Sequence, residues 1–99
     1  MSKSPLELFE KSDPALAKTR REINDLAFSE GALSVKVKTL IALALDADHG
    51  SEGGVKALAQ RAMKSGATKS EIMETIRVAY YIGGVGVLYT AARGLEGVI

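Results

Sequence analysis

Residues 34–71, SVKVKTLIALALDADHGSEGGVKALAQRAMKSGATKSE, carry the pattern that decides the fold. Ser34 suits the start of a helix, because its hydroxyl can accept a hydrogen bond from a free backbone N–H of the first turn. The run from Leu40 to Leu45 is apolar on every side of that helix. A helix of this kind is normally buried all round. We therefore expect residues 34–48 to form a helix with partners on more than one face, including another subunit.

A second helix is predicted over residues 51–64, after a short glycine-rich turn. Ser51 is expected to cap its first turn. Its apolar positions follow a single helical stripe, made of Val55, Leu58, Ala59, Ala62 and Met63. Gly66 suits the position just after the helix, where a left-handed backbone is common. Thr68 and Glu71 then have the spacing of a capping box and begin a third helix.

Two more helices are predicted before this stretch, over residues 5–11 and 14–29. Ser4-Pro5 and Asp13-Pro14 each place proline at the first helical position, after a capping residue. We expect Gly31 to follow the end of the second of these helices. The expected apolar sides are Leu6, Leu8 and Phe9 in the first helix, and Leu16, Ile23, Leu26, Ala27 and Phe28 in the second.

The last third of the chain is predicted to be helical on both sides of a glycine-rich break. The run GGVG at residues 83–86 should interrupt the helix that begins near Lys69, because glycine lowers helical propensity. A further helix is expected over residues 85–93, with Gly94 and Gly97 weakening any continuation. No alternation typical of a strand persists. The sequence thus predicts an all-α protein of five to six helices.

These features together resemble the carboxymuconolactone decarboxylase family, which includes the AhpD-type alkylhydroperoxidase proteins. The likeness rests on LIALAL, the following turn and helix, Gly66-Ala67-Thr68 with its capping box, and AYYIGGVGVLY at residues 79–89. It covers about residues 32–92 without a gap. The resemblance implies an AhpD-like orthogonal helical bundle, a single domain over residues 1–99 with a core hairpin at about 34–66. It also implies an obligate homo-oligomer, a homotrimer or a homohexamer.

The same resemblance argues against the best-known chemistry of the family. AhpD-type members carry a glutamate, a Cys-x-x-Cys pair and a histidine four residues after the second cysteine. The corresponding positions here, where we expect any pocket, hold Thr39, Ser51, Gly54 and Leu58. The chain has no cysteine, which excludes a thiol peroxidase. Leu58 also counts against ordinary decarboxylation, because that branch is expected to keep the histidine.

The most suggestive remaining cluster lies around His49, the only histidine, with Asp46, Asp48 and Glu52 beside it in the sequence. Asp46 and His49 are three positions apart and so are neighbours on a helix. His49 could act as a general base that Asp46 orients. Two alternatives stay open: favourable electrostatics at a helix C-terminus, and metal binding, for which the sequence has no strong motif. No metal site and no cofactor is predicted.

Composition limits which partners and which cellular compartment we expect for the protein. Thirteen basic and twelve acidic residues give a net charge of +1, without the basic footprint of a nucleic-acid-binding protein. No apolar run approaches the length of about 18–20 residues that crosses a membrane. No signal peptide is recognisable, and a cysteine-free fold needs no oxidising compartment. We therefore expect a cytoplasmic protein whose partner is itself, with no nucleic acid and no membrane.

Two functions remain open at this point. The first is a carboxymuconolactone-decarboxylase-like protein that binds a small molecule in an interhelical pocket, or carries out acid–base chemistry on it. The alternative is a non-catalytic structural or ligand-binding oligomer that kept the fold after losing the catalytic relay.

Overall fold

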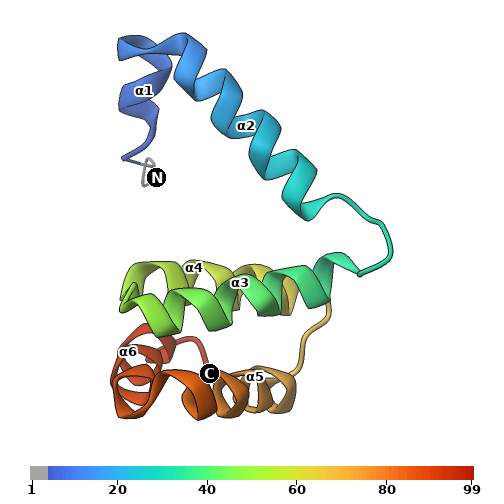
Figure 1. Cartoon of the computed structure of the whole chain (residues 1–99), viewed down its shortest axis with the longest axis vertical. Helices are drawn as coiled ribbons and strands as arrows, with labels where there is room; N and C mark the ends of the chain where they lie inside the picture. Colours follow the sequence, from blue (N-terminus) through green and yellow to red (C-terminus); the bar gives the residue numbers. More distant parts are fainter. Residues whose placement is uncertain (1–4) are drawn as a thin grey trace.

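A computed structural model of the chain describes residues 5–99, and these residues form six helices and no strand. The helices are α1 (Glu7–Ser12), α2 (Pro14–Phe28), α3 (Val35–His49), α4 (Glu52–Lys64), α5 (Lys69–Gly83) and α6 (Val85–Leu95). Figure 1 shows that α3 to α6 form a packed bundle, while α1 and α2 stand away from it as an arm. The predicted all-α class is confirmed.

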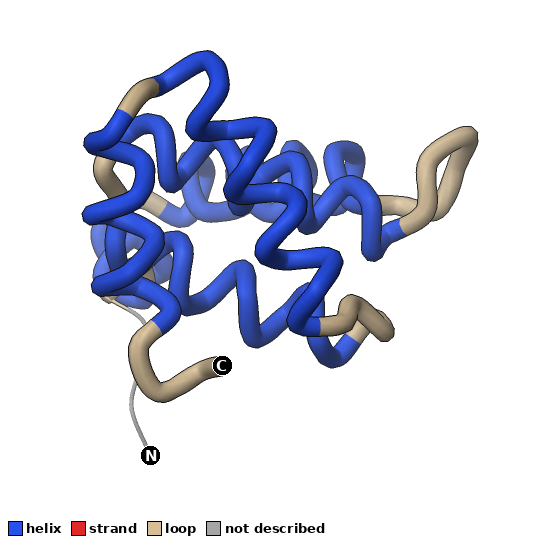
Figure 2. The backbone as a smooth tube through the Cα atoms, turned by 90° about the horizontal axis from the view of Figure 1, so that it is seen from below, coloured by secondary structure: helices blue, strands red, loops and turns tan. Residues whose placement is uncertain are grey.

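The core lies among α3, α4, α5 and α6, which Figure 2 shows from below. One large side chain from each helix is fully buried: Leu43, Val55, Ile72 and Val87. Alanines fill much of the remaining core, which lets the helix backbones approach closely. Each of the four helices therefore buries one stripe in the bundle, where α3 and α6 contact each other and each contacts both α4 and α5.

The predicted helix boundaries in the bundle are largely confirmed by their caps. The Ser34 hydroxyl accepts a hydrogen bond from the Val37 N–H at 3.1 Å. Thr68 and Glu71 form the complete capping box at the start of α5. Gly66 has a φ of 97°, in the left-handed region that favours glycine. The break between α5 and α6 falls at Gly84, where φ is 79°.

The end of α6 differs from the prediction. The helix continues through Gly94 to Leu95 instead of ending near residue 93. Gly94 is buried, and a Cβ atom at this position would lie 2.7 Å from the backbone oxygen of Glu52 and 2.7 Å from the Val55 side chain. Glycine is therefore needed here for a close approach of α6 to α4, and it does not act as a helix terminator.

The N-terminal helices correct three expectations. α1 begins at Glu7 and buries none of its residues, and Ser4, the predicted cap, lies outside the described residues. In α2 only Ala17 is buried and Phe28 is half-buried, so Leu16, Ile23 and Leu26 of the predicted apolar face are left exposed. α2 ends at Phe28 with an extended residue after it, and Gly31 has no left-handed backbone. The physical reason for the low burial is that the arm stands away from the core.

The prediction that α3 is buried all round does not hold within one chain. Leu43 is fully buried, but Ile41 and Leu45 on the opposite side are exposed. The other three bundle helices cover only one side of α3. On the other side, Ile41 and Leu45 border a groove shared with Ala27 and Phe28 of α2, and both α3 side chains stay about half exposed.

Candidate functional site

The candidate residues gather at one end of the bundle, where α3 turns into α4 and α5 gives way to α6 (Figure 1). The turn forms because Gly50 adopts a left-handed backbone with φ of 82°. The backbone N–H groups of Gly50 and Ser51 both donate to the backbone oxygen of Asp46. This local geometry brings the end of α3 directly against the first turn of α4.

The Asp46 carboxylate lies against the first turn of α4. A Cβ atom built on Gly54 would be only 2.0 Å from Asp46 Oδ2 and 2.7 Å from Ser51 Oγ. The carboxylate therefore occupies the space that a side chain at position 54 would need. A negative charge is favourable at the positive end of a helix. The predicted capping role of Ser51 is wrong in part: it is the N-cap residue, but its side chain makes no capping hydrogen bond.

His49 is the last residue of α3 and its side chain is exposed. Within residues 5–99 no hydrogen bond or ion pair joins it to Asp46, whose carboxylate lies towards α4. The three-residue spacing thus places the two on neighbouring parts of the helix without coupling them directly. The role of His49 as a general base stays a prediction.

Further polar groups join this end of the bundle from α4, α5 and α6. A Cβ atom on Gly83 would lie 2.1 Å from Asp48 Oδ1, so this carboxylate seats against the end of α5. Glu52 pairs with Arg93 at 3.5 Å, and the Arg93 guanidinium lies 5.7 Å from the centre of the Tyr89 ring. The sequence analysis did not identify Arg93, although its spacing of four from Tyr89 was a usable signal.

The family site positions hold no ionisable side chain. Thr39 is buried, and its hydroxyl donates to the Val35 backbone oxygen at 2.7 Å, so its hydrogen-bonding capacity is used within α3. Leu58 is partly buried and packs against the core. Proton transfer needs a titratable group within reach of the reacting atom, and neither residue supplies one.

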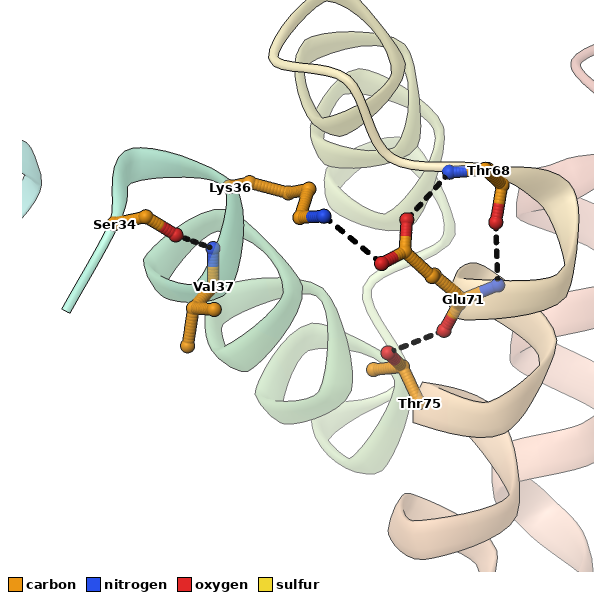
Figure 3. Close-up of polar contacts among 6 residues, drawn as sticks. All are labelled: Ser34, Lys36, Val37, Thr68, Glu71 and Thr75. Carbon is orange, nitrogen blue, oxygen red and sulfur yellow. Dashed lines mark hydrogen bonds and ion pairs between the residues drawn. The ribbon is translucent and has the colours of Figure 1, made fainter.

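Among the described residues, the clearly shifted pKa is that of Glu71, at the start of α5 (Figure 3). Lys36 of α3 donates to the Glu71 carboxylate at 2.9 Å, and the Thr68 N–H donates to it at 2.8 Å. The Lys36 hydrogen bond is the main reason that the pKa of Glu71 lies below its usual range, and the Thr68 N–H adds to it. These contacts are part of a capping box and tie α3 to α5, so they are structural.

Two of the open apolar grooves lie between helices of the bundle. The α5–α6 groove has a volume of about 380 Å³ and a single charged residue, Glu96, in its lining. Its other lining residues are Met73, Ile76, Leu88, Ala91, Ala92, Leu95 and Ile99. The second groove, between α3 and α5, is lined by Val37, Leu40, Ile41, Ala44, Thr75 and Val78. Neither groove includes any of the four family site positions.

Residues 5–99 contain no group of three or more histidine, cysteine, aspartate or glutamate side chains placed to hold a metal ion. Among the same residues, no helix combines the length and the apolar character needed to span a membrane.

Comparisons with known proteins identify the relatives of this fold. Residues 14–96 match the model of the carboxymuconolactone decarboxylase family. A crystal structure of the apo form of a carboxymuconolactone decarboxylase family protein from Legionella pneumophila is similar, with a TM-score of 0.87 and 36% sequence identity. The match covers 92% of this chain and 81% of that one. Among curated proteins, none matches the sequence.

Proposed function

This chain belongs to the carboxymuconolactone decarboxylase family, and we propose that it is a non-catalytic member that assembles with copies of itself and binds a small apolar molecule. It has no cysteine and so no cysteine-based peroxidase relay. The observation that carries the proposal is that neither Thr39 nor Leu58, at two of the family site positions, offers a titratable side chain. One is a buried hydroxyl bonded within its own helix, and the other packs against the core.

The proposed ligand site is the α5–α6 groove. Its volume of about 380 Å³ falls within the range of roughly 300–1,000 Å³ that is typical of small-molecule sites. Its lining is almost wholly apolar, which favours an apolar ligand, and Glu96 at its edge disfavours an anionic one. An uncharged apolar fluorescent probe should bind there. Met73→Glu should weaken binding, whereas Ser70→Glu, an equal charge change on the exposed side of α5, should not.

The proposed assembly is a homotrimer or a homohexamer. It is supported by the many large apolar side chains that are exposed on α2, on α3 and around the junction of α5 and α6. Monomeric proteins rarely expose contiguous apolar patches of more than a few hundred Å². Light scattering should give a mass that is a multiple of 10.5 kDa.

Two assays test the absence of catalysis. Purified protein should consume no hydroperoxide in the presence of a dithiol, and it should not accelerate the decarboxylation of carboxymuconolactone above the uncatalysed rate. Turnover in either assay by a homogeneous, metal-free sample would overturn the proposal.

A second candidate is acid–base chemistry by His49 and Asp46. It is favoured by one observation: the Asp46 carboxylate lies against the start of α4 while His49 remains accessible one helical turn away. If wild-type protein decarboxylates carboxymuconolactone, His49→Ala should abolish turnover without changing the helix content. Equal turnover by His49→Ala would remove this candidate.

A further inference from the structure

The α5–α6 groove is almost wholly apolar, with one charged residue in its lining. Ile76, Ala91 and Leu95 of the lining are buried, and Met73 and Leu88 border the groove as exposed side chains. None of these side chains carries a hydrogen-bond donor. A ligand therefore gains apolar contacts from them, and a polar group on that ligand needs its partner elsewhere in the lining.

Glu96 is the charged residue of the lining and offers such a partner. Its side chain is exposed, and within residues 5–99 it takes part in no hydrogen bond or ion pair. The basic residue of the last turn of α6, Arg93, already pairs with Glu52 of α4 at 3.5 Å. The Glu96 carboxylate therefore remains available to a group on the ligand.

The end of α6 makes the same place more negative. Glu96 directly follows Leu95, the last residue of α6, and the carbonyl groups at a helix C-terminus carry a partial negative charge that favours a cation. Two basic residues of α5, Lys69 and Arg77, lie one turn on either side of Met73, but both are exposed and neither belongs to the lining. This end of the groove is thus complementary to a positive charge.

From this combination we infer that the α5–α6 groove binds a molecule with an apolar body and one positively charged end, of the alkylammonium type. The inference rests on the proposed ligand site and deepens it by naming the charge of the ligand. The apolar body lies along Ile76, Ala91 and Leu95, and the ammonium group pairs with the Glu96 carboxylate at the end of α6.

Other end groups fit this edge of the groove less well. A carboxylate on the ligand would lie beside Glu96, where two like charges repel each other. A hydroxyl could donate a hydrogen bond to Glu96, but it brings no opposite charge. An ammonium group donates to the carboxylate and also carries the charge that a helix C-terminus favours. Because Glu96 is exposed, the gain should be about that of a surface ion pair.

Titration calorimetry on the purified full chain tests the charge of the ligand. The probes n-octylammonium, n-octanol and n-octanoate share one apolar tail and differ in the end group. At neutral pH and low salt, octylammonium should bind about three- to fivefold more tightly than octanol, and octanoate should bind most weakly. High salt should reduce the preference for octylammonium, because the pair with Glu96 is exposed to solvent.

Three variants assign the preference to Glu96 and the binding to the groove. Glu96→Gln should bind octylammonium and octanol equally. Glu30→Gln makes the same charge change at an exposed position outside the lining and should keep the preference. Ala92→Trp places a large side chain in the groove and should weaken the binding of all three probes. Circular dichroism establishes the helix content of each variant.

The outcomes separate this inference from the proposed ligand site. Equal binding of octylammonium and octanol to wild type, with both weakened by Ala92→Trp, would overturn the cationic ligand and leave the apolar site intact. A preference for octylammonium that persists in Glu96→Gln would also overturn the inference. Failure of all three probes to bind wild type would overturn both. If Ala92→Trp loses its helix content, Ala92→Leu repeats the test with a smaller side chain.

Discussion

The α3–α6 bundle and the α1–α2 arm are both helical and both rich in apolar residues, yet they differ in how those residues are covered. In the bundle, each helix buries a stripe against its neighbours, and Leu43 is fully enclosed. In the arm, Leu26 has a comparable side chain on a comparable helix and is 79% exposed. The difference shows that apolar periodicity predicts which side of a helix tends to be buried. It does not predict whether the surface that buries it belongs to the same chain.

The largest effect should come from truncating the bundle core. Leu43→Ala is expected to lower the free energy of unfolding by about 2–5 kcal/mol, because it leaves a cavity among the four helices. Urea unfolding followed by circular dichroism measures this loss, and it should appear at every protein concentration. Leu26→Ala is the matched control in the arm, and its effect should fall as dilution separates the copies. A change below 0.5 kcal/mol for Leu43→Ala would contradict the assignment of the core.

The next effect concerns the contact between α4 and α6. Gly94→Ala should cost about 1–3 kcal/mol, because its Cβ would meet the Glu52 backbone oxygen at 2.7 Å. Gly86→Ala on the same helix is the matched control, since a Cβ there meets nothing within 4 Å. The control should be neutral or slightly stabilising, because alanine favours a helix more than glycine does. Equal unfolding midpoints for the two variants would show that the helices do not approach so closely.

A smaller effect is expected at the start of α5. Thr68→Ala removes the hydroxyl that accepts from the Glu71 N–H at 3.1 Å and should cost about 1 kcal/mol. Thermal unfolding measures it. Ser51→Ala at the start of α4 should cost less, because the Ser51 side chain makes no capping hydrogen bond. The reverse order of the two losses would contradict the capping geometry.

The smallest effect is a pH dependence of the free energy of unfolding. It arises from the contact between Lys36 of α3 and Glu71 of α5. Because the pKa of Glu71 is lowered in the folded chain, chiefly by Lys36, the ionised carboxylate stabilises the fold above the ordinary glutamate pKa of about 4.3. That contribution is lost as the pH falls through the lower folded value. Urea unfolding at pH 7 should therefore separate Glu71→Gln from wild type, and the gap should close in acid. Ser70→Ala, which changes an exposed and uncharged side chain on the same helix, should show no such dependence.

Sequence reasoning recovered the local features of the fold well. Two helices start at Ser34 and Thr68, and two turns form at Gly50 and Gly66. Each of these features depends on residues within four positions of each other, so it can be predicted from a short stretch of sequence. Gly94 was misread because its role depends on Glu52 and Val55, about 40 residues earlier. Only the packed structure brings these residues together.

The candidate site was predicted less completely, for a related reason. The sequence placed Asp46 and His49 on neighbouring parts of a helix, but it could not show that the Asp46 carboxylate would occupy the space beside Gly54. A cysteine at position 54 would meet the carboxylate, so Asp46 and a thiol at this position exclude each other in the present arrangement.

The central claim is that the exposed apolar side of the arm is covered by other copies of the chain. Multi-angle light scattering across micromolar concentrations, on wild type and on Ile23→Glu, tests it most directly. The account predicts that the wild-type mass is at least about three times 10.5 kDa and that Ile23→Glu shifts to smaller species with its helix content unchanged. A wild-type mass of 10.5 kDa throughout that range would contradict the claim.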